Sequence, residues 1–111
     1  MHSTRFAYLK GHVSYPQPIT LLPGTTLTVE LLDTTLEDGA YVTLASHCMR
    51  VGGEIPLHYC LTLDRALLHP GHTYQLSASI RLEPHLLMYT TEPQHVELDP
   101  LPCADVDVLV R

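Results

Sequence analysis

Short segments in which polar and apolar residues alternate are the feature of this sequence that most restricts its fold. The segments at residues 26–31, 73–82 and 105–110 follow this two-residue period, and turn residues such as Pro-Gly, Gly-Gly and Asp-Gly separate segments of this kind. A period of two places the apolar side chains on one face of a β-strand, so each segment is predicted to be a half-buried strand. Many short strands separated by turn residues are typical of an all-β sandwich or barrel.

The turn signals predict a single domain over residues 1–111. Turns are expected at residues 16–18, 21–24, 37–39, 52–53 and 83–85, and a Pro-rich crossover at 99–102. Strands are then expected at residues 6–15, 26–33, 40–51, 54–63, 72–82, 86–91, 95–98 and 104–110. The only helical piece is residues 64–69, where Asp64 is a candidate N-cap. The predicted fold is all-β: an antiparallel β-sandwich of about seven or eight short strands with one short helical turn.

The alternation also predicts which side chains form the core. The inward faces of three strands supply the predicted core residues, Leu27, Val29, Leu31, Tyr74, Leu76, Ala78, Ile80, Val106 and Val108. Six tyrosines provide most of the aromatic bulk, and several are expected at the rim with the hydroxyl in water. Gly11 interrupts the first strand and is expected to mark a bulge or a close approach of another backbone segment.

The charge of the chain argues against several classes of partner. The formal net charge is −6, and the six Lys and Arg residues are scattered. Without a basic stripe, neither nucleic acid nor an anionic membrane surface is an expected partner. No apolar run approaches the ~20 residues of a membrane helix, and residues 1–5 lack the apolar stretch of a signal peptide. The protein is therefore either cytosolic or shown without an export signal that has been cut away.

Three cysteines leave their pairing open. Cys48, Cys60 and Cys103 are odd in number and are not spaced like a zinc knuckle. They fit either one disulfide with one free thiol, or three buried thiols that behave as small hydrophobic residues. The reduced state is favoured, because the chain lacks the dense cysteine framework of small secreted domains.

The histidines do not predict a metal site. His69 and His72 are separated by a Pro-Gly turn, and His58 and Cys60 share a strand face without further ligands. A structural zinc site needs four convergent ligands, which this sequence does not supply. We expect no metal and no cofactor.

No catalytic group is predicted either. Ser46, His47 and Cys48 are adjacent on a strand, so neighbouring side chains face opposite sides and cannot form a nucleophile–base pair. The acidic residues lie mostly at turns and on outer faces, where carboxylates keep β-proteins soluble. The protein is therefore not expected to be an enzyme.

Surplus apolar residues mark candidate partner-binding positions. Leu67 and Leu68 are adjacent, and residues 86–89 are continuously apolar, so a period-two strand cannot bury them all. Leu67, Leu68, Leu87 and Tyr89 are the candidates for binding a partner. The alternative is that Leu67 and Leu68 close one open end of the sandwich.

The order of the strand and turn motifs resembles the YscW-type pilotin lipoproteins of type III secretion, including ExsB-like pilotins, and the related YbaY-like envelope lipoproteins. The similarity begins with Gly-His-Val-Ser-Tyr at residues 11–15 and continues through Leu-Pro-Gly at 22–24 and the strand at 27–33. It includes Pro-Leu-His-Tyr at 56–59, the turn and strand at 70–80, and the segments at 86–91 and 106–110. These motifs cover nearly the whole chain and are structural rather than catalytic.

The resemblance implies a β-sandwich pilotin that binds the C-terminal segment of a secretin subunit and promotes its localisation to the outer membrane and its assembly there. It also implies a lipid on an N-terminal Cys at the periplasmic face of that membrane. Residues 1–4 contain no Cys. We therefore expect that the native gene encodes a signal peptide and a lipidated Cys upstream of Arg5. A monomer is expected. The alternative is a YbaY-like envelope lipoprotein with a structural or inhibitory binding role unrelated to a secretin.

Overall fold

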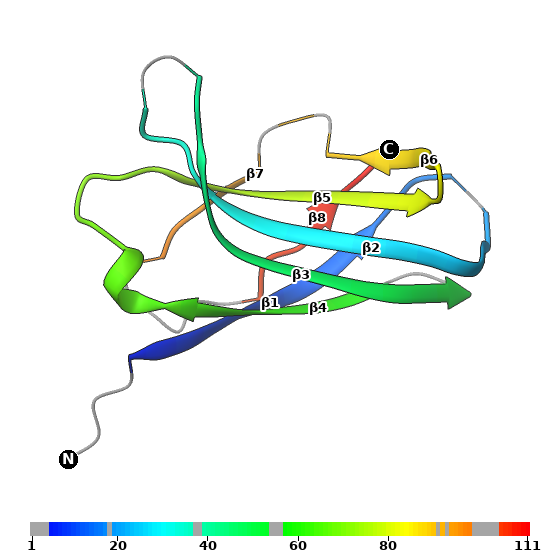
Figure 1. Cartoon of the computed structure of the whole chain (residues 1–111), viewed down its shortest axis with the longest axis horizontal. Helices are drawn as coiled ribbons and strands as arrows, with labels where there is room; N and C mark the ends of the chain where they lie inside the picture. The colour runs from blue at the N-terminus through cyan, green and yellow to red at the C-terminus, as the bar shows by residue number, and fades with distance from the viewer. Residues whose placement is uncertain are drawn as a thin grey trace.

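The computed structural model describes residues 5–17, 19–36, 39–53, 57–90, 92, 94–98 and 105–111 of the chain. These residues form β-strands and one short 3₁₀ helix, so the all-β prediction is confirmed (Figure 1). The elements are β1 (Phe6–Ser14), β2 (Leu21–Asp33), β3 (Val42–Gly53), β4 (Leu57–Asp64), η1 (Arg65–Leu67), β5 (Tyr74–Leu82), β6 (His85–Tyr89), β7 (Gln94–Val96) and β8 (Val108–Leu109).

The strands form two sheets. One sheet has the order β4-β1-β8, and the other has the order β3-β2-β5-β6, with β7 pairing with β5 beside β6. The pairs are antiparallel with one exception, because β8 runs parallel to β1 and places Val108 opposite Val13. Figure 1 shows β1 crossing behind β2 and β3, with β4 running alongside β3. The sandwich is thus antiparallel except at its last strand.

The end of the chain connects the two sheets along one side. Arg111 and Tyr89 exchange both backbone hydrogen bonds at 3.1 Å, so the residues after β8 pair with the end of β6. On the other side, β3 pairs only with β2 and β4 only with β1 within the described residues. One side of the sandwich is therefore bridged, and the other presents the edges of β3 and β4.

The core forms where the alternating faces of the two sheets meet. The predicted core residues are buried, with Leu27, Val29, Leu31 and Ile80 fully so, but Val106 is only half-buried. Val106 precedes β8 at a point where its backbone passes the first strand, and its N–H donates to the Lys10 carbonyl at 2.9 Å. Its side chain therefore packs at the margin of the core.

Gly11 is the close-approach point that the sequence indicated. A Cβ atom at this position would lie 1.8 Å from the Val106 carbonyl oxygen, which is a backbone atom. Only glycine fits here, because the clash is with main chain and not with a side chain that can turn away.

Several expected boundaries were wrong. The turn expected at residues 21–24 lies inside β2, where the register shifts between Leu21 and Thr25. Gly24 has a φ of 90° and Thr25 Oγ1 donates to the Leu22 carbonyl, so these residues form a bulge rather than a chain reversal. The turn expected at residues 52–53 lies in β3, and the closing strand is only Val108–Leu109. Parts of the expected turns at 16–18 and 37–39, residues 54–56 and 91, and the crossover at 99–102 lie outside the described residues.

Half of the tyrosines are not at the rim. Tyr15, Tyr59 and Tyr74 are buried, and their hydroxyls donate to the backbone carbonyls of Ile19, Val106 and His69. Tyr8, Tyr41 and Tyr89 are exposed, as expected. The buried tyrosines replace the hydration of their hydroxyls with internal hydrogen bonds.

The cysteines in the described residues are not buried. Cys48 on β3 and Cys60 on β4 are both free and exposed, so the prediction of buried thiols was wrong for these two. Both lie on edge strands with their side chains on solvent-facing positions. Cys103 lies outside the described residues.

Candidate partner-binding surface

The predicted partner-binding residues lie on two separate surfaces. Leu67 in η1 is 42% exposed, and the neighbouring Leu68 packs partly against the core. Leu87 and Tyr89 in β6 are 43% and 51% exposed. The helix η1 lies at one end of the sandwich and β6 near the other (Figure 1). The structure therefore does not bring the four residues together.

A bulge explains the exposed residues of β6. Ile80 pairs with Met88 and Arg81 with Leu86, so Leu87 is an extra residue on the β6 side. Met88 fills the core, whereas Leu86 and Leu87 are both exposed. The continuous apolar run at residues 86–89 thus buries one residue and leaves three outside.

Leu109 extends this apolar surface and was not among the predicted candidates. Tyr89 and Arg111 form a hydrogen-bonded antiparallel pair, which places their side chains on the same face. Leu109 lies two residues before Arg111 and is also exposed. We call Leu86, Leu87, Tyr89 and Leu109 the β6 surface. The alternation at residues 105–110 already indicated that Leu109 points away from the core.

The other surface contains a cavity of about 710 Å³, which we call the end cavity. Its walls are η1, the loop between η1 and β5, the start of β5, and residues 95–98 at β7. Leu68 lines it, and Leu67 lies next to it in sequence. Its volume is in the range of sites that bind a small ligand or a compact part of a larger one. Sequence reasoning missed it because its walls come from residues 65–74 and 95–98, which are far apart in the chain.

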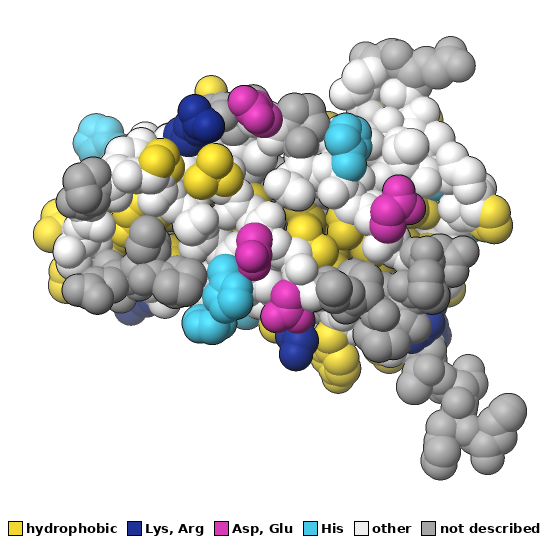
Figure 2. All heavy atoms as spheres, turned by 180° about the vertical axis from the view of Figure 1, so that it is seen from behind, with side chains coloured by type: hydrophobic (Ala, Val, Ile, Leu, Met, Phe, Trp, Pro, Cys, Tyr) yellow, Lys and Arg dark blue, Asp and Glu magenta, His cyan; other side chains and the backbone are white. Residues whose placement is uncertain are grey.

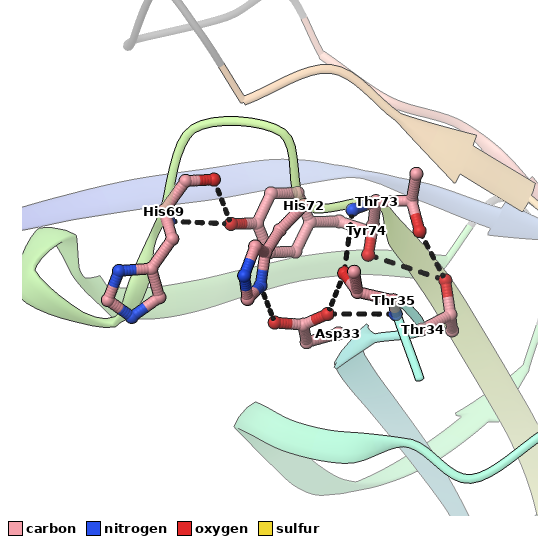
Figure 3. A network of polar contacts seen from close by, with 7 residues as sticks. All are labelled: Asp33, Thr34, Thr35, His69, His72, Thr73 and Tyr74. Carbon is pink, nitrogen blue, oxygen red and sulfur yellow. Dashed lines mark hydrogen bonds and ion pairs between the residues drawn. The ribbon is translucent and has the colours of Figure 1, made fainter. Parts of the chain in front are cut away.

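A polar network holds one wall of the end cavity (Figure 3). Asp33, at the end of β2, accepts hydrogen bonds from the Thr35 backbone N–H and hydroxyl and lies 2.6 Å from Nδ1 of His72. Thr35 Oγ1 in turn accepts the backbone N–H of Thr73 at 3.0 Å. Residues 33–35 are therefore tied to the loop that precedes β5.

The electrostatics of this network favour a charged carboxylate. Partial burial acts to raise the pKa of Asp33, but the hydrogen bonds from Thr35 and His72 outweigh it and hold the pKa below its ordinary value. Asp33 is consequently ionised at neutral pH and is a suitable acceptor for three donors.

Tyr74 fixes the loop from within. Its hydroxyl accepts the His69 backbone N–H at 2.9 Å and lies 3.2 Å from the carbonyl oxygen of the same residue, to which it donates (Figure 3). Both polar backbone groups of His69 are thereby satisfied by one side chain. The loop wall of the end cavity is thus held at Asp33 and at Tyr74.

The predicted chemical candidates do not converge. Among the described residues, no group of three or more His, Cys, Asp or Glu side chains has the geometry of a metal site. His12 and His58 stack edge to face at 4.4 Å between ring centres, and His12 Nδ1 lies 3.1 Å from Asp107. Ser46 and His47 are exposed on β3.

The face in Figure 2 shows hydrophobic, histidine and acidic side chains interspersed, with the dark blue Lys and Arg side chains few and separated. This distribution matches the scattered positions of Lys and Arg in the sequence.

In the part of the chain that the structure describes, no helix is long and apolar enough to span a membrane.

Comparison with known proteins decides the family. The family model described as type III secretion system lipoprotein chaperone (YscW) matches residues 5–107. The chain belongs to this family. The predicted resemblance is therefore confirmed over almost the whole sequence.

A solved structure supports the same relationship. The chain is similar to an alternative pilotin from the type II secretion system of Vibrio cholerae, with 25% sequence identity and a TM-score of 0.82. The similarity covers 96% of this chain and 97% of that pilotin. No curated protein matches the sequence at a significant level. Membership of this family indicates a secretion-system chaperone rather than an enzyme.

Proposed function

We propose that the protein is a pilotin that binds the C-terminal segment of a secretin subunit, directs it to the outer membrane and promotes its assembly there. The observation that carries this proposal is the match of residues 5–107 to a family of secretion-system lipoprotein chaperones. The similarity to a pilotin over 96% of the chain supports it. The protein acts by binding and does not turn over a substrate.

The position of β1 fits a tether at the η1 end of the sandwich. The Arg5 carbonyl accepts the Arg65 backbone N–H at 2.8 Å, and Arg5 Nη2 lies 2.9 Å from Asp64 Oδ2. A lipidated Cys upstream of Arg5 would therefore approach the domain from that end. The domain would then be held at the periplasmic face of the outer membrane, where secretin subunits assemble.

Two modes of peptide recognition suit the exposed parts of this fold. A partner strand can add to the edge of β3 or β4, where backbone hydrogen bonds supply affinity. An amphipathic helix can instead lay its apolar face on Leu67 and the adjoining Leu68, or on the β6 surface. We favour the η1 end, because exposed leucine and a cavity lie together there and a preformed cavity limits the ordering cost of binding.

Fractionation of cells tests the proposed function. In a strain that lacks this gene, we expect the cognate secretin to fall in the outer-membrane fraction by about tenfold or more and to be restored by the full gene. The wild-type gene product should take up a lipid label on one Cys upstream of Arg5.

Normal secretin localisation and multimer formation in the deletion strain would contradict the proposal. That result with intact lipid labelling would favour the YbaY-like alternative, an envelope lipoprotein with another binding role. Soluble protein without lipid label would remove the assignment to the envelope.

A further inference from the structure

The end cavity is lined by a cationic side chain with one buried donor that has no partner among the described residues. Arg65 lines the cavity, and its Nε atom is buried without a hydrogen-bond partner among the described residues. Buried donors without partners are rare in native proteins, because their lost hydration is not replaced. Within the part of the chain that the structure describes, the hydrogen bonds of Arg65 come from its backbone, whose N–H donates to the Arg5 carbonyl and whose carbonyl accepts from the Leu68 N–H. The guanidinium therefore has an unused donor at Nε that a ligand in the cavity could satisfy.

The chemistry of the cavity favours an anion attached to an apolar group. A guanidinium is always charged and binds a carboxylate through two parallel N–H donors. His69 and His95 also line the cavity and can each offer a ring N–H donor, whereas His72 Nδ1 is engaged with Asp33. Glu97 is the acidic residue of the lining and opposes an anion. The apolar side chains of the lining are Leu68, Val96 and Leu98.

The C-terminus of a peptide combines an anion with an adjoining apolar group. The C-terminal residue of a peptide carries a carboxylate beside its side chain, and capture of such a carboxylate is a recurring form of peptide recognition. A cavity of about 710 Å³ accommodates a compact end of a chain and not the length of a helix. We propose that the end cavity binds the C-terminal carboxylate and the last apolar side chain of the partner segment, with Arg65 as the anion-binding residue. The identity of that partner rests on the proposed function.

A small probe tests the cavity without the secretin. N-acetyl-leucine carries the carboxylate and an apolar side chain, and N-acetyl-leucinamide lacks only the charge. Titrated into the full chain at pH 7.5 and followed by NMR, the acid should shift the Arg65 Nε–H signal and the amides of residues 65–74 saturably. The dissociation constant should be on the order of millimolar, which is ordinary for so small a ligand. The amide should give no saturable shift.

Three substitutions test whether the NMR shifts arise from binding of the carboxylate at Arg65. Arg65→Gln should abolish the shifts, whereas Arg81→Gln removes the same charge from an exposed site on β5 and should leave them unchanged. Arg81 lies seven residues along β5 from Tyr74, roughly 23 Å from the cavity wall. Glu97→Gln removes the opposing charge and should tighten binding of the acid several-fold. Equal binding of acid and amide, or an Arg65→Gln variant that behaves as wild type, would overturn the proposal.

Peptides of the secretin segment then distinguish the role of the end cavity from the proposed pilotin function. A peptide of the cognate secretin's C-terminus with a free carboxylate should bind about tenfold or more tightly than the same peptide with a C-terminal amide, and Arg65→Gln should remove that difference. Equal binding of both peptides would refute the role of the cavity and leave the pilotin function standing. Binding of N-acetyl-leucine without binding of any secretin segment would refute the pilotin function and leave the cavity as a carboxylate site.

Discussion

At the scale of single residues, Gly11 is a position where one added methyl group should destabilise the fold. An added Cβ would lie 1.8 Å from the Val106 carbonyl oxygen, so Gly11→Ala must push β1 away from the segment that leads into β8. We expect a loss of about 1–3 kcal/mol or more in the free energy of unfolding, measured in denaturant. Thr62→Ala, on the exposed face of β4, should change it by less than about 0.5 kcal/mol. A stable Gly11→Ala variant would show that the two segments do not meet here.

Leu76 tests the assignment of the inner and outer faces of β5. Its side chain is buried, so Leu76→Ala should destabilise the protein by roughly 2–5 kcal/mol in denaturant unfolding. Leu87→Ala makes the same change at an exposed site and should cost far less. A loss below about 0.5 kcal/mol for Leu76→Ala would mean that the faces of β5 are inverted.

At the scale of elements, the contact between the end of β2 and the loop before β5 should make stability depend on acidity. The pKa of Asp33 is held below its ordinary value in the folded protein, so this carboxylate stabilises the fold above the unfolded pKa of about 4. That contribution is lost as pH falls through the lower, folded pKa. Asp64 acts in the same direction, since the hydrogen bond from Arg5 lowers its pKa.

Denaturant unfolding at several pH values measures this dependence. Between about pH 5 and pH 2 the stability of the wild type should fall more steeply than that of Asp33→Asn. Asp105→Asn, at an exposed carboxylate without a hydrogen-bond or ion-pair partner among the described residues, should keep the wild-type slope. Parallel pH curves for the wild type and Asp33→Asn would exclude a role for the Asp33 network.

The positions of the elements were largely predictable, and their ends were not. A two-residue period located the strands because it depends on each strand having one buried face. Asp64 was recognisable as a cap because an N-cap acts within one turn, and it accepts the Ala66 N–H. The extent of β2 through Gly24 and the bulge that frees Leu87 depend on the partner strands. Such features arise from pairing between distant segments and leave little trace in local sequence.

At the scale of the whole molecule, the order of the strands decides which surfaces exist. The leucine pair and the apolar run predicted that something apolar is exposed, and Leu67 and Leu87 are indeed outside. The sequence did not predict that these residues lie on separate surfaces, because that separation follows from β5 pairing with β6 along one half and β7 along the other. The end cavity could not be predicted, since Arg65 and residues 95–98 meet only through the sheet.

The proposed function of this domain is to bind a secretin's C-terminal segment. Titration calorimetry of the folded domain with that segment should give a one-to-one complex, with a dissociation constant on the order of micromolar to tens of nanomolar. Leu67→Ser should weaken binding about tenfold or more, while Leu87→Ser on the β6 surface makes the same change at a similarly exposed site and should not. The contradicting result is no heat of binding at high micromolar concentration for a wild-type domain that is fully folded.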